Sequence, residues 1–159
     1  MISMQGARSR AAFVVMPFAP EFRPGFDDLI GPAIEAAGLE CVRADQEALG
    51  HIHQMMFERI FESPVVIADI SGCNPNVFYE LGVSHSAARR AITVVREDWI
   101  ERIPFDIAPY RVIVYPKRPE GGSETGGPDR YAAALRASIE ALTAAINSTV
   151  DPTTDGVSN

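Results

Sequence analysis

Two acidic side chains at one strand-to-helix junction have the types and the spacing for chemistry on a sugar. Asp69 stands near the far end of the apolar run 65–70, and Glu80 is the only acidic residue in the helix predicted after it. Cleavage of a glycosidic bond uses such a pair, because one carboxylate attacks or stabilises the cationic sugar carbon while another group handles protons. This chemistry needs no metal ion and no cofactor, so the sequence predicts neither.

Each carboxylate also has a purely structural interpretation. Asp69 could cap the next helix or accept hydrogen bonds from loop N–H groups, which the sequence alone favours over a ligand role. Glu80 could simply face water, and the pattern gives that interpretation equal weight. Its neighbours Val77, Phe78 and Leu81 are apolar, so partial loss of solvent could change the pKa of Glu80.

The loop between the strand and the helix supplies further polar groups. Ser71, Gly72 and Cys73 form the short loop, and Asn74 has a side-chain oxygen suited to capping the helix that follows. Asn76 shares an i, i+4 row with Glu80, so it is the better candidate to contact a sugar hydroxyl. Ser71, Gly72, Asn74 and Asn76 are predicted to bind substrate.

Two aromatic side chains near this junction could stack on a nucleobase. Phe18 follows the first predicted strand, and Tyr79 directly precedes Glu80. Aromatic residues beside strand and helix ends are more often part of a core, so packing is the competing interpretation.

Other reactive side chains lack a partner in the sequence. His51 and His53 are two residues apart, so on a helix they would point away from each other and make a poor chelating pair. His85 lies on the apolar face of its helix, and Cys73 has no identifiable base. The absence of G-x-G-x-x-G, P-loop and G-x-S-x-G motifs argues against dinucleotide-redox, NTPase and serine-hydrolase chemistry.

Five apolar runs alternate with segments of helical periodicity, which predicts a three-layer α/β fold. The predicted strands are residues 11–16, 39–43, 65–70, 91–95 and 111–115. The predicted helices are residues 26–37, 51–62, one that begins at Pro75, a short one at 98–103 and a final one at 131–146. Residues 21–25 and 117–129 are predicted loops.

The second predicted strand alternates apolar and polar residues, as an edge strand does. The flavodoxin-like order 2-1-3-4-5 of a doubly wound parallel sheet therefore fits best, and its chain reverses direction between strands one and three, where ligands bind. This order places the turn of Met16, Pro17 and Phe18 beside the loop after Asp69, with Glu80 less than two helical turns further on. We expect one crevice lined by both segments.

Length and charge limit the classes of function. The 159 residues fit one domain over residues 11–146, with a loose tail at 1–10 and a disordered tail at 147–159. A net charge of −7 argues against a nucleic-acid strand as partner. A polar start without a long apolar segment argues against secretion and membrane spanning. Two cysteines without framework spacing fit a reducing compartment, so a cytoplasmic location is expected.

The sequence ADISGCNPNVFYELGVSHS at residues 68–86, with FVVMPF at 13–18, resembles the nucleoside 2-deoxyribosyltransferase superfamily, which includes deoxynucleoside-monophosphate N-glycosidases and related Toll/interleukin-receptor-like bacterial proteins. The resemblance covers most of residues 11–90. It implies that Glu80 is the nucleophile and that Asp69 orients the sugar or handles a proton. It also implies that Met16, Pro17 and Phe18 replace the Gly-Pro-Phe turn of the transferases, and that subunits can associate to complete a site.

The loop departs from the transferase pattern, because it lacks a second carboxylate, and the form Asn-Pro-Asn-Val-Phe-Tyr-Glu-Leu-Gly resembles the Toll/interleukin-receptor-like branch, some of whose members are thought to cleave NAD. The predicted function is therefore cleavage of the N-glycosidic bond of a nucleoside, nucleotide or NAD, with possible ribosyl transfer. The alternative is a module that binds or senses a nucleotide without catalysis. A neutral base needs an acid such as Asp69 as it leaves, whereas cationic nicotinamide needs none.

Overall fold

The computed structural model describes residues 10–43, 52–87, 91–120 and 127–151, and the described strands form one parallel sheet. The strands are β1 (Ala11–Val15), β2 (Glu40–Arg43), β3 (Val66–Asp69), β4 (Ala91–Arg96) and β5 (Val112–Tyr115). Their order in the sheet is β2-β1-β3-β4-β5, and each neighbouring pair is parallel. The predicted doubly wound fold and its strand order are confirmed.

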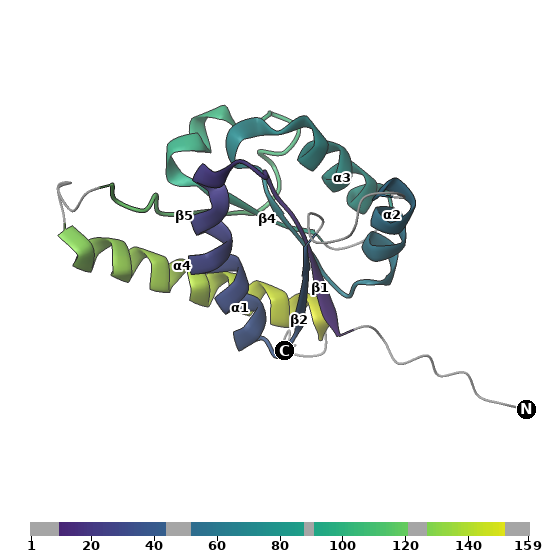
Figure 1. Ribbon diagram of the computed structural model, residues 1–159, viewed down its shortest axis with the longest axis horizontal. Helices are drawn as coiled ribbons and strands as arrows, with labels where there is room; N and C mark the ends of the chain where they lie inside the picture. Colours follow the sequence, from purple (N-terminus) through teal and green to yellow (C-terminus); the bar gives the residue numbers. More distant parts are fainter. Residues whose placement is uncertain (1–9, 44–51, 88–90, 121–126, 152–159) are drawn as a thin grey trace, which may run out of the picture.

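Helices cover both faces of this sheet (Figure 1). The helices α1 (Gly31–Ala36) and α4 (Gly127–Val150) lie on one face, and α2 (Ile52–Glu62) and α3 (Pro75–Ser86) lie on the other. Successive side chains of a strand point to opposite faces, so β1 contributes Phe13 and Val15 to the core under α2 and α3, and Val14 to the core under α1 and α4. Both faces are apolar, which explains the continuous hydrophobic runs.

The chain after β1 differs most from the sequence prediction. Residues 21–25 were expected to be a loop and 26–37 one helix; instead a 3₁₀ turn η1 (Pro20–Phe22) is followed by a π-helix η2 (Gly25–Ile30) that leads into α1. Pro32 has no N–H and cannot donate to the Asp28 carbonyl, whereas the Gly31 N–H reaches back five residues to Phe26. The proline therefore interrupts the regular helical ladder here.

The last helix is longer at both ends than predicted. Helix α4 begins at Gly127, where Pro128 fits the first turn and Asp129 favours the positive end of the helix dipole. It continues to Val150, so the predicted disordered tail was wrong for residues 147–150. The Thr149 hydroxyl donates back to the Ala145 carbonyl, and Val150 packs against the core. Residues 152–159, and residues 1–9 of the tail predicted at 1–10, lie outside the described part.

Two short 3₁₀ segments complete the carboxyl edge of the sheet: η4 (Ser71–Cys73) after β3 and η5 (Glu97–Arg102) after β4. The second corresponds to the short helix predicted at 98–103. Among the described residues, no helix combines the length and the apolar composition needed to cross a bilayer.

Candidate active site at the carboxyl edge of the sheet

Asp69 ends β3 as a fully buried and fully hydrogen-bonded carboxylate. Its Oδ1 accepts from the Ser71 N–H at 2.9 Å and from the Ser71 hydroxyl at 2.6 Å, and its Oδ2 accepts from the Tyr115 hydroxyl at 2.7 Å. The side chain therefore binds loop donors, as its structural interpretation predicts, and connects the end of β3 to the end of β5.

Burial and hydrogen bonding act on Asp69 in opposite directions. Loss of solvent raises its pKa above the usual range, while the hydrogen bonds from Ser71 and then Tyr115 lower it. Burial also raises the pKa of Tyr115, and the nearby Asp69 carboxylate adds to this rise. Tyr115 therefore keeps its proton and remains a donor to Asp69 at any physiological pH.

Ser71 connects this network to β4. Its hydroxyl donates to Asp69 and accepts from the backbone N–H of Arg96 at 2.8 Å. Ser71 is fully buried, so both bonds lie away from water, where an unmade hydrogen bond is costly. Substrate binding by Ser71 stays a prediction, and its observed contacts hold the loop in place.

Two glycines allow neighbouring segments to approach this network closely. Gly72 has a φ of 77°, and a Cβ on it would lie 2.6 Å from the Phe22 ring. A Cβ on Gly25 would lie 2.5 Å from the Tyr115 hydroxyl oxygen. Glycine at both positions lets η1 and η2 close over the ends of β3 and β5.

The Arg96 side chain is buried and held by several groups. Its Nε and Nη2 donate to the two Asp98 oxygens at 2.6 and 2.9 Å, and its Nη1 donates to the Glu21 carbonyl at 3.0 Å. The guanidinium also lies 4.9 Å from the Phe22 ring centre. Hydrogen bonds with Asp98 raise the pKa of Arg96, so it stays charged.

Glu80 has a different environment in α3. It is partly buried, and no hydrogen bond or ion pair joins it to any residue that the structure describes. Loss of solvent raises the pKa of Glu80 to about 7. The sequence interpretation of Glu80 as a simply water-facing residue does not fit this burial.

The flanks of α3 show where Glu80 lies. Tyr79 makes an edge contact with Phe57 of α2, at 6.4 Å between ring centres, whereas His85 stacks on Tyr110 at 4.6 Å on the other flank. Successive residues of an α-helix are rotated by about 100° around its axis. Glu80 therefore lies between the buried side of α3 and the side that faces α2. The helix also contacts β1 and β3, between which the strand order reverses.

The remaining predicted site residues divide into buried and accessible groups. Met16 and Pro17 are buried, and Phe18 is 64% exposed, so only Phe18 of this turn offers a ring to a ligand. Tyr79 is 58% exposed, and Asn76 is exposed on the row that it shares with Glu80. Exposed aromatic rings at both places leave the stacking interpretation open.

The predicted cap of α3 is confirmed. The Asn74 Oδ1 accepts from the Asn76 N–H at 2.9 Å, and Pro75 occupies the first turn. This bond satisfies one of the free N–H groups at the start of the helix. Asn74 therefore has a structural contact in addition to its predicted role in binding substrate.

The two carboxylates do not share a crevice in the way the sequence predicts. Along β3, Ile67 lies in the core under α1 and α4, so Asp69 points to the same face, where it meets Tyr115. Glu80 belongs to a helix on the opposite face. Asp69 is also 0% exposed. The expectation that both side chains line one solvent-reachable cavity was wrong for Asp69, because the segment after β1 covers it.

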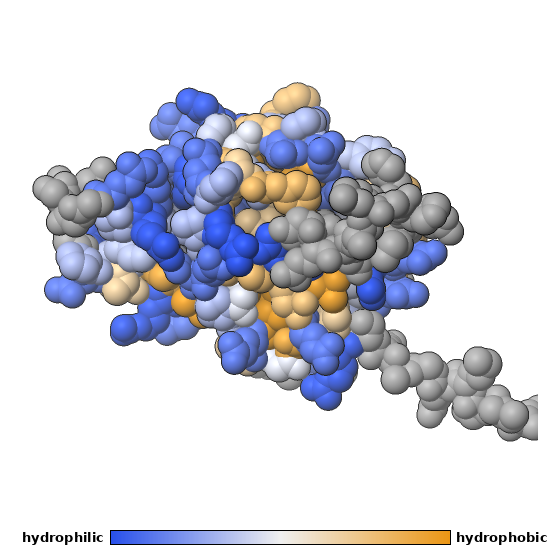
Figure 2. Space-filling model, viewed as in Figure 1, coloured by the Kyte–Doolittle hydropathy of each residue, from blue (hydrophilic) through white to orange (hydrophobic). Residues whose placement is uncertain are grey.

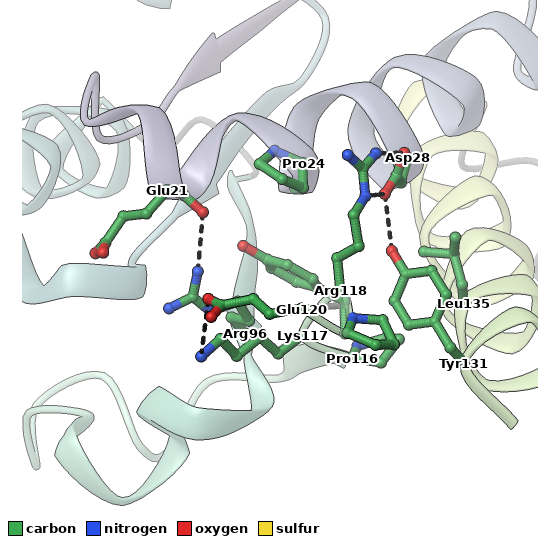
Figure 3. Close-up of a pocket in the computed structure, with 13 residues that line it drawn as sticks. Glu21, Pro24, Asp28, Arg96, Pro116, Lys117, Arg118, Glu120, Tyr131 and Leu135 are labelled. Atoms are coloured by element: carbon green, nitrogen blue, oxygen red, sulfur yellow. Dashed lines mark hydrogen bonds and ion pairs between the residues drawn. The ribbon is translucent and has the colours of Figure 1, made fainter. Parts of the chain in front are cut away.

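A cavity of about 220 Å³ opens instead at the carboxyl ends of β4 and β5 (Figure 3). Its walls come from η1, η2, residues 115–120 and the first turns of α4, together with Arg96, and they include neither Asp69 nor Glu80. Tyr115 joins this cavity to the buried network, because its ring lines the cavity while its hydroxyl donates to Asp69.

Sequence reasoning missed Arg96, Tyr115 and Gly25. Arg96 and Tyr115 are the last residues of β4 and β5, and polar side chains at the carboxyl ends of parallel strands are the ones that meet at a site. The same rule that selected Asp69 would have selected both. Gly25 gave no such signal, because its role depends on a contact with a residue far away in the sequence.

No metal centre is found in the described part of the chain, where no three His, Cys, Asp or Glu side chains gather. His51 and the side chain of His53 lie outside the part that can be described. The Cys73 thiol donates to the Arg102 carbonyl at 3.5 Å, so its nearest described polar contact is a backbone oxygen.

Comparison with known proteins identifies no family. No family model matches the sequence, and no curated protein matches it either. Among solved structures, the chain resembles the C-terminal domain of glucosamine-fructose-6-phosphate aminotransferase from Francisella tularensis, with 13% identity and a TM-score of 0.41 over 89% of this chain and 35% of that chain. A likeness of this size supports no inference about function. Membership of the nucleoside 2-deoxyribosyltransferase superfamily remains a prediction.

Proposed function

We propose that the protein cleaves an N-glycosidic bond with Glu80 as nucleophile, and that its substrate is NAD or a similar compound with a cationic base. The observation that carries this proposal is Glu80 itself: a partly buried carboxyl without a hydrogen-bond partner in the described residues, on a helix that contacts β1 and β3, between which the strand order reverses. A carboxylate in such surroundings is not engaged in holding the fold together, so it is available to a substrate.

The reaction has two balanced steps. A Glu80 oxygen bonds to the anomeric carbon as the bond from that carbon to the base breaks, and the base leaves with the electron pair. Water then attacks the same carbon, the ester to Glu80 breaks, and one proton passes to solvent. With NAD the products are ADP-ribose, nicotinamide and a proton.

The environment of Asp69 favours a cationic leaving group. Asp69 is buried beneath Ser71 and Tyr115, so it is badly placed to protonate a neutral base. Glu80 cannot attack and donate a proton in the same step. Nicotinamide leaves from a ring that is already positively charged and needs no acid, which supports NAD over a neutral nucleoside.

The test compares base release by three proteins: wild type, Glu80→Gln, and Glu58→Gln as a control for losing one exposed carboxylate from a helix. NAD, deoxynucleosides and deoxynucleoside monophosphates are each incubated with the protein, and free base is measured by chromatography. We expect NAD turnover by the wild type and the control, and at least about a 1,000-fold lower rate with Glu80→Gln. Equal rates for wild type and Glu80→Gln would overturn the proposal.

The pH profile assigns the role of Glu80. A nucleophile must be ionised, so the rate should rise with pH through about 7, the pKa of Glu80. A rate that falls through the same range would make Glu80 the acid and would contradict nucleophilic attack.

A binding module without catalysis is the second candidate function. The exposed rings of Phe18 and Tyr79 favour it, because both can stack on a base without any reaction. Saturable binding of NAD without release of nicotinamide, and with affinity reduced by Phe18→Ala or Tyr79→Ala, would support this function over the first.

A further inference from the structure

The cavity at the ends of β4 and β5 is lined by charged groups of both signs, which differ in how many of their hydrogen-bonding atoms are already used. Its cations are Arg96, Lys117 and Arg118, and its carboxylates are Asp28, Glu21 and Glu120. In Figure 3, Arg118, Asp28 and Tyr131 lie on one side of the cavity, and Arg96, Lys117 and Glu120 lie on the other. The surface over β5 and the start of α4 is mainly hydrophilic (Figure 2).

The acceptors on the first side are already occupied. Asp28 receives hydrogen bonds from Arg118 at both oxygens, and the Tyr131 hydroxyl donates to its Oδ2 at 2.7 Å. Asp28 is thus paired and largely neutralised. Glu120 has a side chain that is 89% exposed and lies 3.9 Å from Lys117, and Glu21 is exposed. Water therefore screens both glutamates.

The donors are not used up in the same way. A guanidinium carries five N–H groups; Arg96 uses three of them in its bonds to Asp98 and Glu21, and Arg118 uses two in its bonds to Asp28. Lys117 makes one long ion pair. The Arg96 guanidinium is buried and held at three atoms, so its position is fixed before any ligand arrives. Asp98 and Asp28 balance the charges of Arg96 and Arg118, so the cavity offers unused guanidinium N–H donors and the Lys117 ammonium without a net positive charge.

We propose that this cavity binds a phosphate group, with Arg96, Lys117 and Arg118 as donors. Phosphate oxygens accept several hydrogen bonds from guanidinium groups at once, and donors that converge from different sides suit its tetrahedral shape. Pro24, Pro116 and Leu135 add apolar wall to the cavity beside these donors. The phosphate could belong to a nucleotide or be carried by another small molecule. This site is separate from Glu80, so it does not rest on the proposed reaction.

The test uses the full chain carrying Glu80→Gln, so that no substrate is consumed. Inorganic phosphate is titrated at constant ionic strength, and binding is followed by calorimetry and by backbone NMR signals of Gly25, Lys117 and Tyr131. We expect saturable binding with shifts at these three positions. Acetate at the same concentrations should bind more weakly. Equal affinity for acetate, or no saturation with phosphate, would overturn the proposal.

Matched variants separate a phosphate site from general charge attraction. Arg118→Ala should weaken phosphate binding about tenfold or more, whereas Arg136→Ala, which removes an exposed arginine of α4 outside the cavity, should leave it unchanged. Arg118 is 52% exposed in its side chain, so its variant should fold. Tyr131→Phe removes a bond to Asp28 but no cation and should keep affinity. Equal weakening by both arginine variants would contradict the proposal.

Titration of a nucleoside, its monophosphate and ribose 5-phosphate distinguishes the sources of the phosphate. If the phosphate of a nucleotide is the ligand, Arg118→Ala should weaken binding of the monophosphate and leave binding of the nucleoside unchanged. If a separate phosphorylated compound is the ligand, ribose 5-phosphate should bind, and Arg118→Ala should weaken that binding in the same way. Binding of neither phosphorylated compound would overturn the assignment of a phosphate site.

Discussion

Asp69 and Glu80 are both acidic, and burial raises the pKa of both, yet they occupy opposite kinds of environment. Asp69 is fully buried and accepts three hydrogen bonds from Ser71 and Tyr115. Glu80 is only partly buried, and no described residue donates a hydrogen bond to it. The comparison shows that loss of solvent alone does not reveal function. A buried carboxylate with all its partners holds structure, and one without partners is available for chemistry.

The largest expected effect on stability comes from removing the structural carboxylate. Asp69→Ala leaves the buried donors of Ser71 and Tyr115 without an acceptor, which should lower the free energy of unfolding by about 3 kcal/mol. Urea denaturation measures this loss, with Asp106→Ala at an exposed turn as the control. Asp69→Asn keeps one oxygen for Ser71 and should lose less. Equal losses at Asp69 and Asp106 would show that the network contributes nothing.

Removal of a single donor should have a smaller effect. Tyr115→Phe deletes the hydroxyl that donates to the Asp69 Oδ2 but keeps the buried ring. The free energy of unfolding should fall by about 2 kcal/mol. Tyr110→Phe is the matched control, because Tyr110 is 53% exposed and its stack on His85 does not use the hydroxyl. A loss no greater than that of the control would mean that Asp69 does not need this donor.

Replacement of Glu80 should raise the free energy of unfolding, whereas replacement of Asp69 or Tyr115 lowers it. Its pKa in the folded protein is about 7 and lies above its value in the unfolded chain, so the folded state binds the proton more tightly. The contribution of Glu80 to stability is therefore greatest at low pH and falls as pH rises from about 4.5 to above 7. Glu80→Gln should be more stable than wild type by about 1–2 kcal/mol at pH 8, after allowance for partial solvation, and equal to it near pH 4. Denaturation at both pH values measures the difference. A variant less stable than wild type at pH 8 would contradict a desolvated, unpartnered Glu80.

The smallest effect concerns the glycine in Tyr-Glu-Leu-Gly. Gly82 is exposed in α3, and a Cβ on it would meet no atom within 4 Å. Gly82→Ala should therefore raise the free energy of unfolding by about 0.5–1 kcal/mol through helix propensity. If catalytic turnover falls while stability rises, the open space beside Gly82 is used by substrate. A loss of stability would show that the backbone needs glycine here.

The fold was predictable because its signals are local. Continuous apolar runs mark strands that are covered on both faces, and the half-polar second strand correctly placed β2 at an edge. The cap at Asn74 followed from two residues that are adjacent in the sequence. The interruption at Pro32 also had a local signal, but the sequence does not show that the chain responds with a π-helix in place of a loop.

The candidate site was only partly predictable because its contacts are distant in the sequence. Burial of Asp69 depends on Tyr115 and on the segment near Gly25, and neither the direction nor the closeness of those approaches is encoded beside Asp69. Glu80 could be selected, because it is the only acidic residue in its helix. The cavity could be predicted only in part, because Arg96 ends a strand whereas Lys117 and Arg118 belong to the chain after β5.

The bond between Asp69 and Tyr115 has a consequence for a chain that is still being made. Tyr115 lies 46 residues after Asp69, so the ribosome completes β3 well before the donor for its final carboxylate oxygen exists. Parallel strands pair only after long connections have closed, which makes such sheets slow to assemble. A nascent chain that ends before Tyr115 must keep Asp69 hydrated, and the carboxyl edge can become dry only when the fifth strand docks.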